Sequence, residues 1–342
     1  MEQPYRNISL CAFFTSLLAF AGCGGSGNGA NNTGATTGTV SYVYSKSIGA
    51  ATGVLTEPDA IALDNVGNIL VANFASTGIS RISKFDANGN FINIFGNAGT
   101  TATGLLSGPQ GVNVDANGNV YVADSGNQRI VKFNSNEGFV AAFLAGQVGF
   151  PYQINEDSLG NLYVAAAIGT NGMAIKKFSS SGALLATIGN SGPAGGILSD
   201  PDGVAFDKNN NMYVADFDRK CIVEYNSAGV FMKVFGNSGS GQLAGPQGVY
   251  VASTGKVFVA DLTGNRVVEY DSSGNFVQSI GASSGAGLLS GPYDVNMDLT
   301  GNLLVVDEHN NRVAVFAPSA AAMSLAVRPS LGVENTSRVG HH

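Results

Sequence analysis

The sequence has no tryptophan, and it has few charged residues and few histidines. The last two shortages each exclude a class of protein. Charged residues make up 12% of the 342 residues and hydrophobic residues 44%, a composition unlike that of disordered chains. The 17 basic residues are outnumbered by 24 acidic ones, and an acidic chain is repelled by the phosphates of nucleic acids. We therefore expect a folded protein that does not bind nucleic acid.

Histidine is too scarce for a histidine-held zinc site, which needs several converging imidazoles. The three histidines are His309, His341 and His342, and the last two end the chain. We expect His309 to be a solvated loop residue rather than a catalytic base.

The chain also lacks a long hydrophobic run, because its apolar stretch from Leu10 to Gly22 is shorter than the ~20 residues of a membrane-spanning helix. This length fits a signal peptide over residues 1–22. The stretch ends in Phe20-Ala21-Gly22-Cys23, which resembles the lipobox of bacterial lipoproteins. That resemblance implies that Cys23 carries a lipid anchor, and an ordinary cleaved signal peptide is the alternative.

A linker without charge follows, since residues 23–39 are rich in Gly, Asn and Thr. We expect this linker to be flexible. The sequence thus predicts an exported protein of the cell envelope, at the periplasmic face or the cell surface. Its contact with the membrane would be through the lipid anchor only.

Six similar units fill the rest of the chain, and the 47 glycines supply many of their tight turns. The units begin at Pro58, Pro109, Pro151, Pro201, Pro246 and Pro292. Each contains short apolar segments separated by Gly or Asn turns, a pattern typical of antiparallel strands. Their length fits the ~40–50 residues of a four-stranded propeller blade.

The ends of the array predict how the ring closes. The last unit has three strand segments, whereas an extra strand-like segment, Val40 to Ile48, precedes the first unit. Pairing this segment with the last unit would remove exposed strand edges. We predict an all-β fold, a six-bladed β-propeller over residues 40–316, followed by a mobile tail over 317–342. We expect it to be a monomer.

The second unit reads PQGVNVDANGNVYVADSGNQRIVKF from Pro109, and the other units repeat this pattern with variations. It resembles the NHL repeat. Unit one departs from the pattern at Asn73, and unit three departs at Ala166 and Ala174.

Two kinds of charged residue recur in several units. Recurrence suits a structural role, because an active site needs one asymmetric cluster. A strand-end aspartate can accept backbone N–H groups of the next turn, and an arginine five residues later can pair with it or with a neighbouring blade. These residues are Asp124, Asp216, Asp261 and Asp307, with Arg129, Arg266 and Arg312. In unit four Cys221 replaces the arginine, and we expect a packed thiol there.

The residue after each initial proline begins the innermost strand, close to the axis of the ring. These six residues are Asp59, Gln110, Tyr152, Asp202, Gln247 and Tyr293. Like residues occupy opposite blades, and Asp294 lies next to them in sequence. The set suits a polar ligand or a hard cation, and a merely hydrated channel is the alternative.

Glu156 is a further candidate, because the other units have an apolar residue at its position. The proteins that the sequence resembles through its NHL-like repeats include calcium-dependent lactonases and histidine-dependent lyases. By that resemblance Glu156, Asn155, Asp59 and Asp202 could coordinate calcium, the one cofactor we consider. The leading hypothesis is a non-catalytic protein with no cofactor that binds protein, peptide or glycan. The alternative is a calcium-dependent lactonase or lyase.

Overall fold

The computed structural model describes residues 40–50, 53–74, 80–97, 103–167, 172–281 and 284–319. The predicted signal peptide, Cys23 and its linker, and all but the first residues of the predicted tail lie outside these ranges. Among the described residues, no helix is long and apolar enough to cross a membrane.

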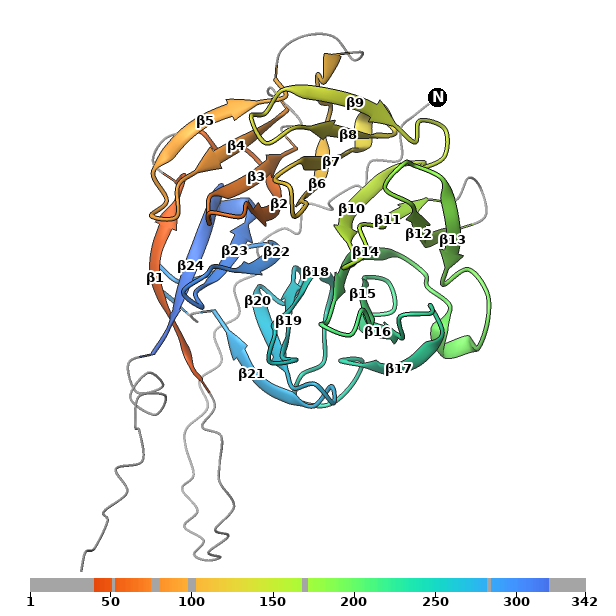
Figure 1. Cartoon of the computed structure of the whole chain (residues 1–342). Helices are drawn as coiled ribbons and strands as arrows, with labels where there is room; N and C mark the ends of the chain where they lie inside the picture. Colours follow the sequence, from red (N-terminus) through yellow and green to blue (C-terminus); the bar gives the residue numbers. More distant parts are fainter. Residues whose placement is uncertain are drawn as a thin grey trace, which may run out of the picture. The chain divides into compact units, whose positions relative to one another are not determined.

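Six four-stranded antiparallel sheets make up the described fold, and they are arranged as blades of a ring (Figure 1). Blade 1 contains β2 (Pro58–Leu63), β3 (Ile69–Asn73), β4 (Arg81–Phe85) and β5 (Phe91–Phe95). Blade 2 contains β6 (Pro109–Val114), β7 (Val120–Asp124), β8 (Arg129–Phe133) and β9 (Phe139–Phe143). Blade 3 contains β10 (Pro151–Glu156), β11 (Leu162–Ala167), β12 (Met173–Phe178) and β13 (Leu184–Ile188).

The other half of the ring has the same plan. Blade 4 contains β14 (Pro201–Phe206), β15 (Met212–Asp216), β16 (Cys221–Tyr225) and β17 (Phe231–Phe235). Blade 5 contains β18 (Pro246–Val251), β19 (Val257–Asp261), β20 (Arg266–Tyr270) and β21 (Phe276–Ile280). Blade 6 contains β22 (Pro292–Met297), β23 (Leu303–Asp307), β24 (Arg312–Pro318) and β1 (Tyr42–Ile48). The six-bladed, all-β prediction is therefore confirmed, with every innermost strand beginning at the predicted proline.

The N-terminal strand β1 closes the ring as predicted. It pairs antiparallel with β24, from Tyr42 opposite Pro318 to Ile48 opposite Val313. Strand β24 thus continues to Pro318, two residues past the predicted boundary at residue 316, because β1 offers it a hydrogen-bonding partner along this whole length. Beyond the sheet, Ser319 donates its backbone N–H to the carbonyl of Ser41.

The hydrophobic core lies between neighbouring blades. One buried cluster joins Leu70 and Ile82 of blade 1 to Val122 and Val131 of blade 2, and similar clusters fill the other interfaces. Each innermost strand also lies against the innermost strands of both neighbouring blades. A single sheet cannot bury both of its surfaces, so this radial stacking supplies the burial that each blade lacks.

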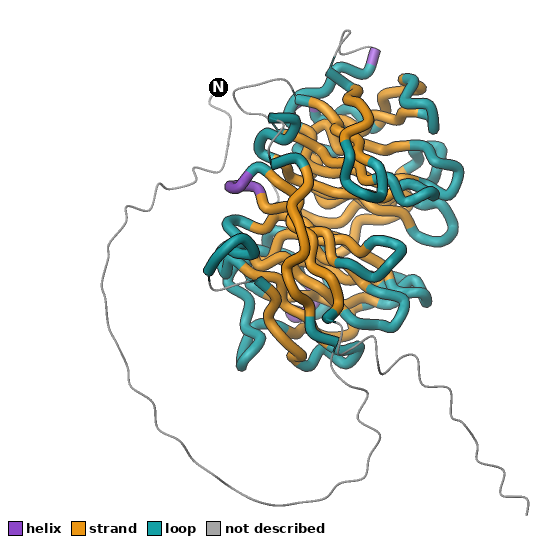
Figure 2. The backbone as a smooth tube through the Cα atoms, turned by 90° about the vertical axis from the view of Figure 1, so that its left-hand side faces the viewer, coloured by secondary structure: helices purple, strands orange, loops and turns teal. Residues whose placement is uncertain are grey.

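The strands make up the body of the ring, and the helical segments are short (Figure 2). Those that lie wholly within the described ranges are η2 (Ser125–Asn127), η3 (Ala194–Gly196) and η4 (Glu308–Asn310). We call the side where each innermost strand begins the loop face, since it carries the loops that link one blade to the next. The opposite side, with the tight turns inside each blade, is the turn face.

Candidate functional site

The turn face is held together by aspartates that accept hydrogen bonds within their own turns. Asp64 Oδ1 accepts the backbone N–H groups of Val66 at 3.1 Å and Asn68 at 2.8 Å. Four other blades repeat this arrangement, at Asp115, Asp157, Asp207 and Asp298. Such turns satisfy backbone donors locally, so these carboxylates have a structural function.

The strand-end aspartates lie at the loop face and are fully buried. Asp124 Oδ1 accepts the N–H of Ser107 at 2.7 Å, and its Oδ2 lies 2.7 Å from Nε of Arg129. The equivalent pairs in blades 5 and 6 are Asp261 with Arg266 and Asp307 with Arg312. The arginine therefore pairs within its own blade. In these three blades the backbone N–H donors come from the loop that precedes the blade, whereas the sequence suggested the turn that follows. In blade 4 Asp216 also accepts an N–H from the following turn, that of Arg219 at 3.3 Å.

Blade 4 keeps this arrangement with a different arginine. Asp216 accepts the N–H groups of Ser199 and Asp200, while the thiol of Cys221 is buried, and burial raises its pKa to about 11. Arg219 lies 3.9 Å from Asp216 and donates to the carbonyl of Gly195 in the preceding loop. An arginine displaced by two residues thus replaces the one that the repeat lacks.

A β-bulge at the start of each innermost strand determines where the axial side chains point. In every blade the residue after the proline has no partner in the neighbouring strand, as between Pro58 and Ala60 or between Pro201 and Gly203. An unpaired bulge residue can redirect its side chain. All six predicted residues line one small cavity at the axis, together with Gln153 and Gly248, and we call this set the axial cup.

The cup is narrow because the innermost strands approach closely. A Cβ added at Gly203 would lie 2.3 Å from the carbonyl oxygen of Gln247, so a side chain there would force two blades apart. The space open to a water-sized molecule is about 10 Å³, which corresponds to about one water.

Two opposed carboxylates, Asp59 and Asp202, lie in the cup and are each 4% exposed. Burial raises the pKa of Asp59 well above its usual value, the charges of Glu308 and Glu57 raise it further, and a hydrogen bond from Gln110 opposes the shift. Burying an acid is costly for stability unless it is compensated, and acids with raised pKa values occur preferentially at functional sites.

Asp294 follows the cup residue Tyr293 in β22 and is buried, but it is not one of the residues that line the cup. Its Oδ2 accepts the N–H of Ile61 at 3.1 Å and its Oδ1 accepts that of Val295 at 2.8 Å. Burial raises the pKa of Asp294 to about 7, and these bonds and one from the Gln153 side chain oppose the shift. Because blades 3 and 6 are opposite, the bond between Gln153 and Asp294 crosses the axis.

Sequence comparison among the units could have identified Gln153. It occupies the same position in blade 3 as Asp294 in blade 6, where the other units have glycine or alanine.

The four predicted calcium ligands do not come together. Asp59 and Asp202 are second in their strands at the loop face, whereas Asn155 and Glu156 end β10 at the turn face. Strand rise separates these two levels by about 13 Å. The Asn155 amide donates to the carbonyl of Val204, and burial raises the pKa of Glu156. Among the described residues, no three acidic, histidine or cysteine side chains are grouped to hold a metal.

His309 lies in η4 on the loop face, with its side chain 48% exposed. Its Nε2 is 3.4 Å from Oε2 of Glu308, and its Nδ1 is 3.4 Å from the hydroxyl of Ser290. It is therefore a partly solvated loop residue with an acidic neighbour.

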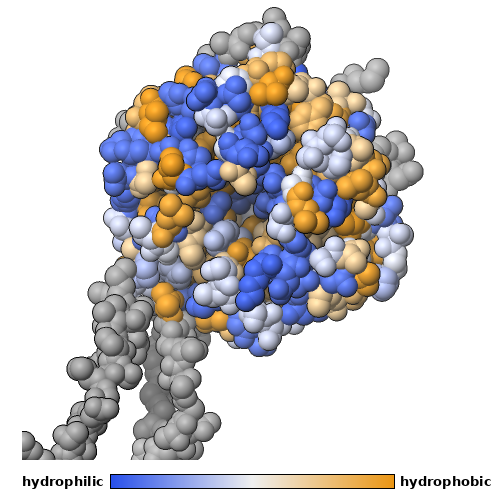
Figure 3. Space-filling model, viewed as in Figure 1, coloured by the Kyte–Doolittle hydropathy of each residue, from blue (hydrophilic) through white to orange (hydrophobic). Residues whose placement is uncertain are grey.

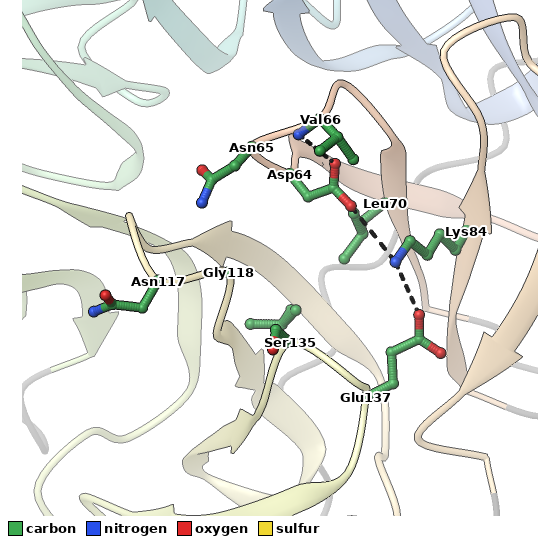
Figure 4. Close-up of a pocket in the computed structure, with 10 residues that line it drawn as sticks. Asp64, Asn65, Val66, Leu70, Lys84, Asn117, Gly118, Ser135 and Glu137 are labelled. Carbon is green, nitrogen blue, oxygen red and sulfur yellow. Dashed lines mark hydrogen bonds and ion pairs between the residues drawn. The ribbon is translucent and has the colours of Figure 1, made fainter.

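A larger cavity of about 230 Å³ lies between blades 1 and 2 at the turn face (Figure 4). Lys84 extends into it and is 3.5 Å from Asp64 and 3.0 Å from Glu137. Both carboxylates of this cavity are paired with Lys84, whereas the axial cup has no basic residue in its lining, so we take the cup as the candidate site. On the face seen in Figure 3, hydrophilic and hydrophobic side chains are mixed.

Comparisons with known proteins agree with this geometry. Residues 106–133, which span most of blade 2, match the NHL repeat family model. The chain is a six-bladed β-propeller that carries an NHL repeat. No curated protein sequence matches the chain.

Solved structures share the fold at low sequence identity. A gluconolactonase from Xanthomonas campestris is 14% identical, with a TM-score of 0.60 over 78% of this chain and 87% of that one. A streptogramin B lyase is 14% identical, with a TM-score of 0.57 over 80% and 97% of the two chains. A chain of a nidogen/laminin complex is 18% identical, with a TM-score of 0.53 over 65% and 79%. Enzymes and a protein-binding assembly are thus both represented, and the fold alone does not decide between them.

Proposed function

We propose that this propeller is a non-catalytic binding and scaffold protein of the cell envelope, which binds a protein, peptide or glycan on its loop face. The observation that carries the proposal is the convergence of six polar side chains on one axial cup. Recognition sites commonly combine a concave surface with a few buried polar groups.

One cup residue lacks the partner that its position requires. Gln247 is 4% exposed and lines the cup, and its Nε2 has no hydrogen-bond partner. Leaving a buried amide donor unsatisfied costs about 1–3 kcal/mol. A ligand that brings an acceptor oxygen would recover this free energy.

Arrays of defined peptides and glycans, probed with the full chain, test the proposal. We expect binding that is weakened by Gln247→Ala or by Tyr152→Ala, both in the cup. Leu159→Ser is the control, because Leu159 is 78% exposed on the turn face. Binding that the cup variants retain and the turn-face variant loses would overturn the loop-face assignment.

The membrane anchor is a second part of the proposal, and it is supported by the sequence around Cys23. Labelled fatty acid should enter the wild-type protein in its host but not a Cys23→Ser variant. Equal labelling of both proteins would contradict the anchor and favour an ordinary signal peptide.

The alternative, a calcium-dependent lactonase or lyase, has lost the ligand set that the sequence predicted for it. Metal analysis of the purified full chain still tests it directly. Stoichiometric calcium that disappears in Asp59→Asn or Asp202→Asn would favour the enzyme and contradict the binding-only proposal.

A further inference from the structure

The most exposed apolar side chains of the propeller lie on the turn face. Among the described residues, the three large apolar side chains with the greatest exposure are Val66, Leu159 and Leu299, which are 74–80% exposed. Each occupies the turn between the first and second strands of its blade, in blades 1, 3 and 6. Side chains this exposed add little to burial in the described fold, so the fold does not account for their apolar character.

The outermost strands add to this apolar surface. Because strand direction alternates within a blade, every outermost strand begins at the turn face, and its first or second residue is an exposed apolar one in all six blades. These residues are Val43, Phe91, Ile92, Phe139, Val140, Leu184, Leu185, Met232 and Phe276. Within the described ranges, the large exposed apolar residues of the loop face are Ile197 and Leu288. Apolar surface gathered on one side of a protein is typical of a docking surface for a protein or a membrane.

The chain enters the fold on the same face. Strand β1 of blade 6 begins at Tyr42, opposite Pro318, where β24 ends. Since β24 begins beside η4 on the loop face, its end and the start of β1 lie at the turn face. Leu299 belongs to this blade and lies next to the turn of Val66, because a Cβ added at Gly67 would be 3.3 Å from its Cδ1. The entry of the chain and the most exposed apolar side chains therefore share one face.

The length of chain before β1 limits how far the propeller can lie from the proposed anchor. Residues 24–39, sixteen residues without a charge, join Cys23 to Val40. A Gly-rich chain of this length has a root-mean-square end-to-end distance of about 22 Å and spans about 54 Å when fully extended. Tethering over such distances gives an effective concentration of the order of millimolar, at which weak contacts become populated. An anchor at Cys23 thus holds the apolar turn face close to a lipid surface.

Charge does not supply the attraction. Lysines near the turn face are paired within the fold, as Lys177 is with Asp157 at 3.3 Å and Lys256 with Glu269 at 2.6 Å. The net charge of -7 opposes approach to an anionic surface. The surface that fits this face is therefore a lipid surface contacted through apolar side chains.

We infer that the turn face docks on the membrane that holds the anchor. Val66, Leu159 and Leu299 enter the interfacial layer of the lipid, and the loop face points away from it. This inference rests on the proposed function, since it needs the anchor at Cys23 and leaves the loop face open to its ligand.

Quenching of tryptophan fluorescence by lipid tests the inference, because the chain has no tryptophan of its own. Leu159→Trp and Leu299→Trp place one on the turn face, and Leu288→Trp places one at an exposed leucine of the loop face. The chain from Cys23 onward contains every described residue, and it is coupled through Cys23 to a maleimide lipid in phosphatidylcholine vesicles. The thiol of Cys221 is buried and should not react.

Brominated acyl chains serve as the quencher, and vesicles without bromine are the reference. The two turn-face tryptophans should lose most of their fluorescence and shift to shorter wavelength, because they lie in the lipid interface. The loop-face tryptophan should keep its intensity and its wavelength. Adding phosphatidylglycerol should not strengthen the quenching, since the contact is apolar and the chain is acidic.

A second set of variants controls for the added tryptophan, which itself favours lipid interfaces. In the Leu299→Trp protein, Val66→Ser/Leu159→Ser should reduce the quenching, because it removes the other apolar contacts of the turn face. The matched pair Ile197→Ser/Leu288→Ser on the loop face should leave the quenching unchanged. Circular dichroism checks the fold of both variants.

Three results would overturn the inference. They are equal quenching of Leu288→Trp, absence of quenching in both turn-face variants, and quenching that Val66→Ser/Leu159→Ser leaves unchanged. Absence of quenching would assign the apolar turn face to a protein partner instead of lipid. Because the maleimide lipid replaces the natural one, these results concern the docking face alone, whereas fatty-acid labelling at Cys23 tests the anchor separately.

Discussion

Aspartates on the two faces of the propeller differ in what holds them. On the turn face, burial alone would raise the pKa of Asp64, but hydrogen bonds from Asn68 and Val66 and the charge of Lys84 lower it below its usual value. At the axis of the loop face, burial raises the pKa of Asp59. A hydrogen bond from Gln110 lowers it, but not enough to offset the effect of burial.

The opposite pKa shifts of the two kinds of aspartate show which acids stabilise the fold. A turn aspartate is satisfied by donors within five residues of its own chain, so the same residue recurs from blade to blade. The axial acids Asp59 and Asp294 depend in part on donors from other blades, the Gln110 side chain for Asp59 and the Ile61 N–H for Asp294, and burial raises the pKa of both. Recurrence therefore marks structure, and the buried acids that do not recur mark the candidate site.

The largest effect on the free energy of unfolding is expected at the buried strand-end aspartates of the loop face. Asp124→Ala would leave Arg129, whose side chain is 8% exposed, as a buried cation without its carboxylate, at a cost of about 3–5 kcal/mol in the free energy of unfolding. Asp216→Ala should cost less, since Arg219 is 26% exposed and 3.9 Å away. Urea denaturation measures both, and equal losses would contradict the importance of the buried arginine.

The next effect depends on pH and concerns Asp294. Its pKa is about 7 in the folded protein and near 3.8 when exposed, so the folded state binds more protons between these values. Stability is then highest at low pH and falls as pH rises towards 7, by at most about 4 kcal/mol from this group. Asp294→Asn should remove this part of the pH dependence of the melting temperature. The same slope in both proteins would show that Asp294 is charged throughout.

A smaller effect is expected at the turn face. Asp157→Ala removes the acceptor of the N–H groups of Leu159 and Asn161 and of the Tyr163 hydroxyl, and should cost about 1–3 kcal/mol. Ligand binding at the loop face should not change. Thermal unfolding and the peptide array together check this, and lost binding in a folded variant would break the division between the faces.

The smallest effect is expected at an exposed turn. Leu159→Ser changes a side chain that is 78% exposed, so the free energy of unfolding should change by less than about 0.5 kcal/mol. Denaturation in urea is the measurement. A larger loss would show that the Leu159 side chain packs against other residues of the chain and is not exposed.

Most of the fold could be predicted from local pattern. Strand alternation and the Gly and Asn turns predicted the six units, and the unmatched segment before Pro58 predicted the closure by β1. The end of β24 could not be predicted, since Pro318 is ordered by its pairing with Tyr42, which is distant in sequence.

The site was predicted in part. The six residues after the prolines do meet at the axis, because one bulge recurs in every blade. Glu156 was grouped with Asp59 through the resemblance to calcium-dependent lactonases, and strand direction places them at opposite faces. Gln153 departs from the Gly or Ala of most units, but its hydrogen bond to Asp294 depends on the ring bringing opposite blades together.

The sequence by itself determined the blades, their turns and the order in which they follow, because these features depend on donors and acceptors a few residues apart. Only the tertiary structure decided that Gln153 joins the six predicted residues in the axial cup, how narrow the cup is and that Arg219 serves Asp216 in blade 4. Those properties depend on distances between blades, which no local pattern encodes.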